Sequence, residues 1–241
     1  MISKGAATKA KDATNEQFEC EAVMPMDKKR SIKTPKANIV PDHQKSIGLE
    51  RVIFFSDAVF AIAITLLVLE IRLPPPTEAV KDAELLSKLL GLWQSYMAYV
   101  LSFLVIGTFW IGHHRKFHFI RRTDPMLIRL NLLFLMIVAF VPFPSAIISE
   151  YSGRTATIFY AMIMLLASLC MAAMWWHASR NNQLVDHDLS KKERRRQLIA
   201  PLLTAGIFLI SIGISFLNPF FAKIIWLLSL AASLYAGRSM Q

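Results

Sequence analysis

Six apolar segments, each close to the length of a membrane-spanning helix, follow a polar N-terminal stretch. They comprise residues 52–73, 92–112, 126–148, 156–178, 198–217 and 220–237. A helix needs about 20 apolar residues to cross the hydrocarbon core of a bilayer. Pro74-Pro75-Pro76 ends the first segment, Pro142 and Pro144 predict a kink in the third, and Asn218-Pro219 predicts a tight turn before the sixth. The pattern therefore predicts an all-α membrane protein with six transmembrane helices.

The first 48 residues lack an apolar run as long as the core of a signal peptide. Their polar composition predicts a disordered, uncleaved tail over 1–48, followed by a six-helix transmembrane domain over 49–241. The stretch Thr77–Leu90 is amphipathic and predicts a short helix at the membrane interface.

The charge distribution predicts which side of the membrane each loop occupies. The net charge of +10 would suggest nucleic acid in a soluble protein, but 54% of the residues are hydrophobic and only 18% are charged. In membrane proteins, basic loops remain on the cytoplasmic side. Alternate loops hold 21 Lys and Arg residues on one side against five on the other. Both termini are therefore predicted to be cytoplasmic, and no nucleic-acid partner is expected.

The first apolar segment differs from the others because one of its faces is apolar and another contains a carboxylate. At 100° per residue, Ile62, Thr65, Leu66 and Leu69 share one stripe of the helix, whereas Asp57 lies about 140° from Ile62. An ionisable group at membrane depth costs about 2.5–3.5 kcal/mol on insertion scales, so Asp57 is expected to face protein or water.

Two motifs resemble those of a known channel family. Arg51-Val52-Ile53-Phe54-Phe55-Ser56-Asp57 is similar to the R-x-x-x-F-S-D signature of the transmembrane protein 175 family of potassium channels, and it stands at the start of the first span. Trp110-Ile111-Gly112-His113-His114 is similar to the tryptophan–histidine segment of that family. The six-helix layout over residues 48–240 agrees with this resemblance.

The resemblance implies a prokaryotic channel built from a single six-helix unit. Such a chain would form a homotetramer in the cell membrane, in a bacterial-type inner membrane, with the first helix of each copy lining a central pore. Potassium ions, the lipid bilayer and other copies of the chain would be its partners, and no cofactor is implied.

The resemblance also implies roles for particular residues. Ile62 would form the narrowest apolar ring of the pore, Leu66 and Leu69 would extend it, and Thr65 would supply a hydroxyl layer linked with potassium preference. A second group would hold the first helix in place, and its members are Arg51, Phe55, Ser56, Asp57, Trp110, His113 and His114.

The residues themselves are compatible with this channel chemistry. The chain contains no T-V-G-Y-G-like run, so a carbonyl filter is not available, whereas an apolar constriction can gate by dewetting. Selectivity from a hydroxyl layer is expected to be modest. A proton-conducting channel is the alternative, and a secondary transporter is a weaker one, because the first three helices do not visibly repeat in the last three.

An enzyme is not expected, and several residues have simpler interpretations. Asp57 and Glu70 lie about 20 Å apart along a helix, too far to share a substrate atom.

The Thr65 hydroxyl has an alternative partner in the Ala61 carbonyl. Asp57 is either a buried structural hydrogen-bond acceptor or a proton-relay or ion-binding carboxylate. His114 and His118 are spaced for one helix face, but no further ligands are evident, so no metal site is predicted.

Overall fold

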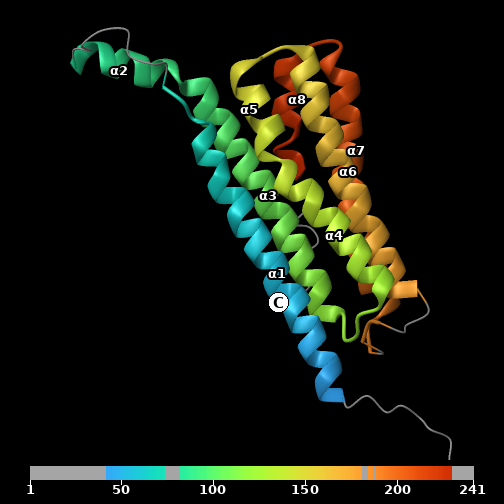
Figure 1. The fold of residues 1–241 in the computed structure, drawn as a ribbon. Helices are drawn as coiled ribbons and strands as arrows, with labels where there is room; N and C mark the ends of the chain where they lie inside the picture. The colour runs from blue at the N-terminus through green and yellow to red at the C-terminus, as the bar shows by residue number, and fades with distance from the viewer. Residues whose placement is uncertain (1–41, 74–81, 181–183, 187, 230–241) are drawn as a thin grey trace, which may run out of the picture. The chain divides into compact units, whose positions relative to one another are not determined.

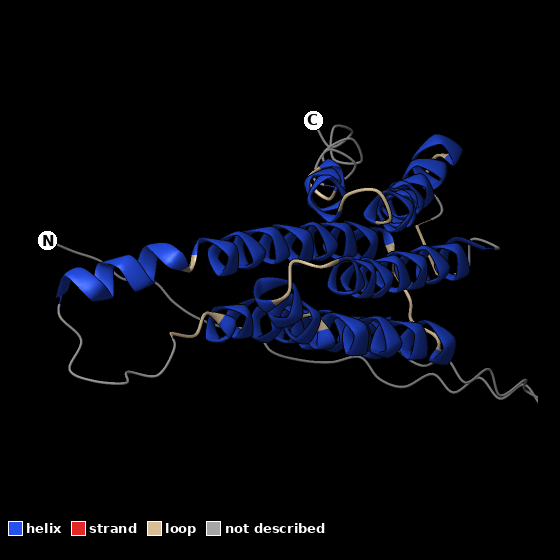
Figure 2. Cartoon of the chain, turned by 90° about the horizontal axis from the view of Figure 1, so that it is seen from above, coloured by secondary structure: helices blue, strands red, loops and turns tan. Residues whose placement is uncertain are grey.

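A computed structural model describes residues 42–73, 82–180, 184–186 and 188–229. The regular structure of these residues is helical (Figure 2). The elements are α1 (Asp42–Leu66), the 3₁₀ helix η1 (Leu67–Glu70), α2 (Asp82–Gly91), α3 (Trp93–Phe119), α4 (Pro125–Phe140), α5 (Pro142–Glu150), α6 (Arg154–Ser179), α7 (Lys191–Ser215) and α8 (Pro219–Ile225). This confirms the all-α prediction.

Five helical stretches in the described part of the chain are long and apolar enough to cross a membrane. They are Gly48–Glu70, Trp93–Phe119, Pro125–Glu150, Arg154–Ser179 and Lys191–Ser215. They correspond to the first five predicted spans. The predicted sixth span begins in α8, but its residues 230–237 lie outside the described residues, so six spans remain a prediction.

The N-terminal boundary differs from the predicted one. Helix α1 begins at Asp42, before the predicted end of the tail at residue 48. Pro41 followed by Asp42 is a sequence typical of a helix start, because proline fits the first turn and an acidic residue favours the positive end of the helix dipole. The predicted disorder of residues 1–41 lies outside the described residues.

The helix of the second span continues beyond residue 112, where the predicted span ended. Helix α3 continues to Phe119 and buries His113, Lys116 and Phe117. These positions follow the i, i+3, i+4 spacing of one helix face, so they pack inward although the run after residue 112 is polar on average.

The third predicted span is broken where its prolines begin. Helix α4 ends at Phe140, and α5 starts at Pro142 after the single turn residue Val141. The Val141 N–H bonds to the Val138 carbonyl at 3.1 Å, in a tightened last turn. Pro142 has no N–H to continue the α-helical ladder. The predicted kink is thus confirmed.

Aromatic side chains occupy the space between α1, α3 and α4. In Figure 1, α1 and α3 run side by side, and α4 lies between this pair and the α6–α7 pair. Phe60 of α1 lies 5.9 Å from Phe134 of α4, and Phe109 of α3 lies 6.1 Å from Phe134, both measured between ring centroids. These buried rings give α1 a closely packed inner face.

The turn predicted at Asn218-Pro219 joins α7 to α8. The Asn218 side chain accepts a hydrogen bond from the Phe220 N–H at 2.8 Å and so caps α8. The indole N–H of Trp226, just beyond α8, donates to Ser211 at 2.6 Å, and its ring stacks on Tyr160 of α6 at 4.5 Å. The residues after the turn are therefore fastened to both α6 and α7.

A polar contact closes one end of the bundle. Asp124 caps α4 by accepting a hydrogen bond from the Leu127 N–H at 2.8 Å, and its other oxygen lies 2.8 Å from Nε2 of His177 in α6. Partial burial opposes ionisation of Asp124, but the hydrogen bonds from Leu127 and His177 outweigh it and lower the pKa of this carboxyl below its ordinary value of 3.8.

This contact predicts a loss of stability in acid. A carboxyl whose pKa is lowered by folding stabilises the protein above its ordinary pKa, and this contribution disappears as the pH falls through the lowered value. Thermal unfolding of the purified protein between pH 6 and pH 3 is expected to show a decreasing melting temperature at the acid end. Asp124→Asn retains a capping side chain without the charge and should melt a few degrees lower at pH 6, with less further loss in acid. If the melting temperatures of wild type and Asp124→Asn depended on pH in the same way, the stabilising role of the Asp124 charge would be contradicted.

Candidate pore-forming helix and its anchors

A buried chain of polar side chains ties α1 to α3 and α4. Ser56 Oγ donates to the Val52 carbonyl at 2.7 Å and accepts a hydrogen bond from Nδ2 of Asn131 at 3.0 Å. Oδ1 of Asn131 lies 2.8 Å from Nε2 of His113. Ser56, Asn131 and His113 are each at most 1% exposed. Buried polar groups are costly without partners, so this layer fixes the relative register of the three helices.

Aromatic rings enclose the His113 imidazole. Its ring stacks on Phe117 at 4.3 Å and lies nearly parallel to Phe134 at 5.8 Å, and Phe60 of α1 contacts it from a third side at 5.7 Å. Among the described residues, Asn131 is the side chain within hydrogen-bonding distance of the imidazole, and the aromatic rings surround it. This arrangement supports a structural role for His113.

Asp57 and Trp110 form the second anchor between α1 and α3. The indole N–H of Trp110 donates to Oδ1 of Asp57 at 2.9 Å. Asp57 is therefore a hydrogen-bond acceptor for a neighbouring helix. The Trp110 ring in turn lies 5.7 Å from His114.

Removal of the indole donor is expected to weaken this anchor. Trp110→Phe retains an aromatic ring but leaves Asp57 without its bond to α3, which should cost about 1 kcal/mol of unfolding free energy. Trp93→Phe is the matched control, since Trp93 lies in α3 with 60% of its surface exposed and has no comparable carboxylate partner among the described residues. Unfolding by a denaturing detergent measures both variants. An equal decrease in unfolding free energy in Trp110→Phe and Trp93→Phe would show that the bond from Trp110 to Asp57 does not stabilise the protein.

The predicted pore stripe lies on the outer face of α1 and η1. Ile62 is 58% exposed, Leu66 40% and Leu69 63%, and Thr65 is also exposed. The Thr65 hydroxyl lies within hydrogen-bonding distance of the Ala61 carbonyl at 3.0 Å and the Ile62 carbonyl at 2.9 Å. The alternative in which the Thr65 hydroxyl donates to the Ala61 carbonyl is therefore confirmed. The oxygen retains lone pairs that can face outward.

Three residues of the two motifs lie on the exposed surface of α1 and α3. Arg51, Phe55 and His114 are exposed, and in the described part of the chain no hydrogen bond connects Arg51 to α3 or α4. Arg51 and Phe55 precede Ile62 by eleven and seven residues, close to whole helical turns, so they share the outer face with the pore stripe. Their expected role in holding α1 against its neighbours stays a prediction.

Asn131 is the anchor residue that the sequence interpretation missed. It is a single amide within the apolar segment Pro125–Phe140, and such a polar side chain at membrane depth faces protein rather than lipid. This signal was available in the sequence. The identity of its partners was not, because Ser56 lies 75 positions away along the chain.

The described residues contain no group of three or more His, Cys, Asp or Glu side chains placed to hold a metal ion. His114 and His118 are both exposed on α3. The chemistry of this region is therefore that of an apolar stripe with one hydroxyl, backed by hydrogen-bonded anchors.

Comparisons with known proteins agree with the motifs. The family model for the endosomal/lysosomal potassium channel TMEM175 matches residues 51–142. A potassium channel of Streptomyces collinus is 40% identical over 173 residues, which are 70% of this chain and 82% of that protein. The endosomal/lysosomal proton channel TMEM175 of Gallus gallus is 30% identical over 155 residues, which are 60% of this chain and 31% of that protein.

The fold of this chain matches a solved structure over nearly the whole length of that structure. The crystal structure of a lysosomal potassium-selective channel TMEM175 homolog from Chamaesiphon minutus matches with a TM-score of 0.68 and 35% identity, and the match covers 80% of this chain and 99% of that one. Motifs, fold and relatives thus agree, and the chain belongs to the TMEM175 family.

Proposed function

We propose that this chain is a potassium-permeable channel of the cell membrane, in which α1 from each of four copies lines a central pore. The proposal rests on the potassium-channel relatives and on the two faces of α1. The inner face is fixed to α3 and α4 by the Ser56–Asn131–His113 layer and the Asp57–Trp110 bond. The outer face presents an exposed apolar stripe, which points away from α3 and α4.

The main observation behind the proposal is that the anchors fix how α1 is rotated about its own axis. Because the polar groups of α1 are bonded inward, Ile62, Leu66 and Leu69 have to face away from the bundle. Four such stripes around an axis form successive apolar rings. A narrow apolar ring excludes water and opposes ion passage, so Ile62 serves as the constriction in this proposal.

Thr65 supplies the polar layer of the proposed pore. With its proton directed to a carbonyl of its own helix, its oxygen is free to accept a cation in place of one water molecule. A hydroxyl layer binds less strongly than a cage of carbonyls, so selectivity for potassium is modest.

The loop charges support an orientation with both termini in the cytoplasm. Arg154 lies at one end of the bundle, at the start of α6, and the basic run Lys191–Arg196 lies at the start of α7. If α8 begins a sixth span, the number of spans is even. The C-terminus then lies on the same side of the membrane as the N-terminal tail.

A proton-conducting channel is the second candidate, because the Gallus gallus relative is a proton channel. The two functions differ in which gradient sets the reversal potential. In planar bilayers with opposed potassium and proton gradients, we expect the reversal potential to follow potassium. A reversal potential that follows pH would favour the proton channel, and the absence of any current would contradict both.

Thr65→Ala is expected to reduce the potassium-to-sodium permeability ratio by about threefold to tenfold, equivalent to about 0.6–1.4 kcal/mol for a lost hydroxyl contact. Thr157→Ala is the matched control, since Thr157 also donates to a carbonyl four residues before it, at 3.1 Å, but is buried in α6. The ratio follows from bi-ionic reversal potentials. Equal ratios in wild type and Thr65→Ala would remove Thr65 from the selectivity layer.

A further inference from the structure

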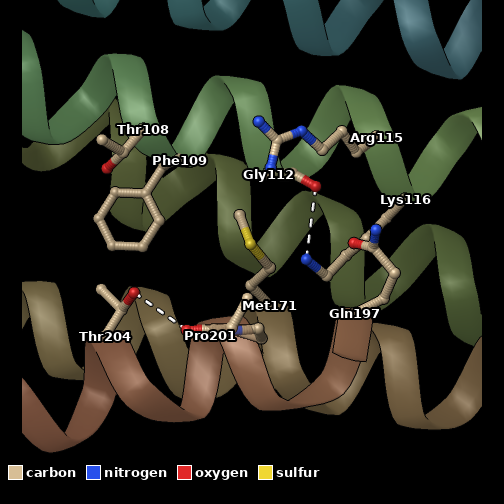
Figure 3. A pocket seen from close by; sticks show the side chains of 10 residues that line it. Thr108, Phe109, Gly112, Arg115, Lys116, Met171, Gln197, Pro201 and Thr204 are labelled. Atoms are coloured by element: carbon tan, nitrogen blue, oxygen red, sulfur yellow. Dashed lines mark hydrogen bonds between the residues drawn. The ribbon is translucent and has the colours of Figure 1, made fainter. Parts of the chain in front are cut away.

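A small cavity lies between α3, α6 and α7, away from the outer face of α1 (Figure 3). Its volume is about 30 Å³. The residues that line it are Thr108, Phe109, Gly112, Arg115, Lys116, Met171, Gln197, Ala200, Pro201 and Thr204. Two of them are cationic and none is acidic. The charged side chains that line the cavity are therefore both cationic, and the carboxylate of Glu193 lies beside it, bonded to Gln197.

Lys116 places its ammonium group inside this cavity. The side chain is 1% exposed, and Figure 3 shows its nitrogen directed toward Met171 and the Gly112 carbonyl. The bond to that carbonyl is long, 3.4 Å, and no carboxylate of the described residues forms an ion pair with Lys116. An ammonium group has three N–H donors, so at least two remain for another partner.

A buried charge without a counter-charge is unfavourable. Removing an ion from water costs several kcal/mol even after the protein relaxes, and an ion pair or hydrogen bonds have to offset this. The neighbouring Arg115 lines the same cavity, and the Glu193 carboxylate lies near enough to interact with it. The buried Lys116 ammonium group is therefore the charge that favours a bound anion over a cation.

The other polar groups of the cavity are already engaged. The Thr108 hydroxyl donates to the Val105 carbonyl at 2.7 Å, and the Thr204 hydroxyl donates to the Ala200 carbonyl at 3.1 Å. The Gln197 amide donates to Glu193 at 2.8 Å. Lys116 is consequently the principal donor available to an occupant.

Gly112 keeps the space beside Lys116 open. A Cβ atom at this position would lie 3.3 Å from the Met171 sulfur and 3.9 Å from Lys116 Nζ. At Gly107, five residues earlier in the same helix, an added Cβ would have no neighbour within 4 Å. Gly112 is therefore the position at which a single methyl group narrows the cavity.

We propose that this cavity binds a monatomic anion, chloride, held by the Lys116 ammonium group. The volume is room for about two water molecules, because one water needs about 10–15 Å³ measured in this way. A chloride ion with one water fits that space. Bound chloride neutralises the buried ammonium group and joins α3 to α6 and α7.

Thermal unfolding in chloride and in gluconate tests the proposal. At constant potassium concentration, replacing gluconate with chloride should raise the melting temperature of the purified full-length protein by about 2–4 °C, the shift expected when the ligand is at several times its dissociation constant. Lys116→Met should remove this rise, and Lys192→Met, which changes an exposed lysine of α7, should preserve it. An equal rise in wild type and Lys116→Met would overturn the site.

Bromide diffraction on the wild-type protein provides a test that needs no variant. Crystals grown in bromide should show an anomalous peak in hydrogen-bond contact with Lys116 Nζ. Gly112→Ala should weaken both the peak and the chloride-dependent stabilisation, whereas Gly107→Ala should change neither. A wild-type cavity without anomalous signal, containing water only, would overturn the proposal even if chloride stabilised the protein elsewhere.

Discussion

Replacement of Ile62 with asparagine is expected to raise the potassium conductance of reconstituted channels by about tenfold, which corresponds to about 1.4 kcal/mol removed from the permeation barrier. The proposed constriction opposes ions because an apolar ring does not hold water. Four amide side chains at that ring would hydrogen-bond water and support a continuous wetted path. Potassium selectivity should decrease in the same variant, because a wider wetted ring discriminates less between ions.

The chain contains a closely matched control for this experiment. Ile210 in α7 has the same side chain and is 59% exposed, against 58% for Ile62. Ile210→Asn therefore places the same polar group on an equally exposed apolar surface that the proposal leaves outside the pore. Single-channel recording should show a changed conductance for Ile62→Asn alone. Equal behaviour of both variants would contradict the assignment of α1 as the pore lining.

The membrane spans could be predicted from composition because hydrocarbon leaves the backbone few options. Every N–H and C=O group has to be satisfied within the chain, so a long apolar segment has to be helical. The break before Pro142 was predictable for a similar local reason. Such features depend on a few neighbouring residues, and sequence analysis sees them directly.

The extent of α3 was harder to predict, because average polarity and helical spacing point in different directions there. The run from His113 to Arg122 is polar overall, so the predicted span ended at residue 112. Burial follows the face of the helix, and His113, Lys116 and Phe117 lie on the face that packs inward. A periodicity analysis of that run would have found this; an average over the run does not.

The anchors depend on contacts between distant segments, and the sequence predicted them only in part. Asp57 and Trp110, which are hydrogen-bonded in the structure, were both candidates because they belong to recognisable motifs. Asn131 belongs to no motif, and the layer that it completes requires α1 and α3 to approach α4 at one particular level. Arg51 was assigned to the anchors although its position places it on the opposite face.

Asn131 is the residue whose loss should most disturb the packing of α1. Asn131→Leu keeps a side chain of similar size but removes the donor to Ser56 and the acceptor for His113. Interhelical hydrogen bonds in membranes contribute about 0.6–1.7 kcal/mol each, since the unfolded chain in the membrane also finds partners. Two lost bonds therefore predict a decrease of about 1–3 kcal/mol in the unfolding free energy.

Unfolding by a denaturing detergent in mixed micelles measures this decrease, and Gln94→Leu provides the comparison. Gln94 also donates to a serine, Ser152, at 2.6 Å, but at an exposed site where water replaces the lost partner. Its loss should cost less than about 1 kcal/mol. A double-mutant cycle with Ser56→Ala should give a coupling energy of at least about 0.5 kcal/mol to Asn131. If Asn131→Leu were as stable as Gln94→Leu and uncoupled from Ser56, the buried layer would not be what holds α1, and the rotation that directs Ile62 toward the pore would need another cause.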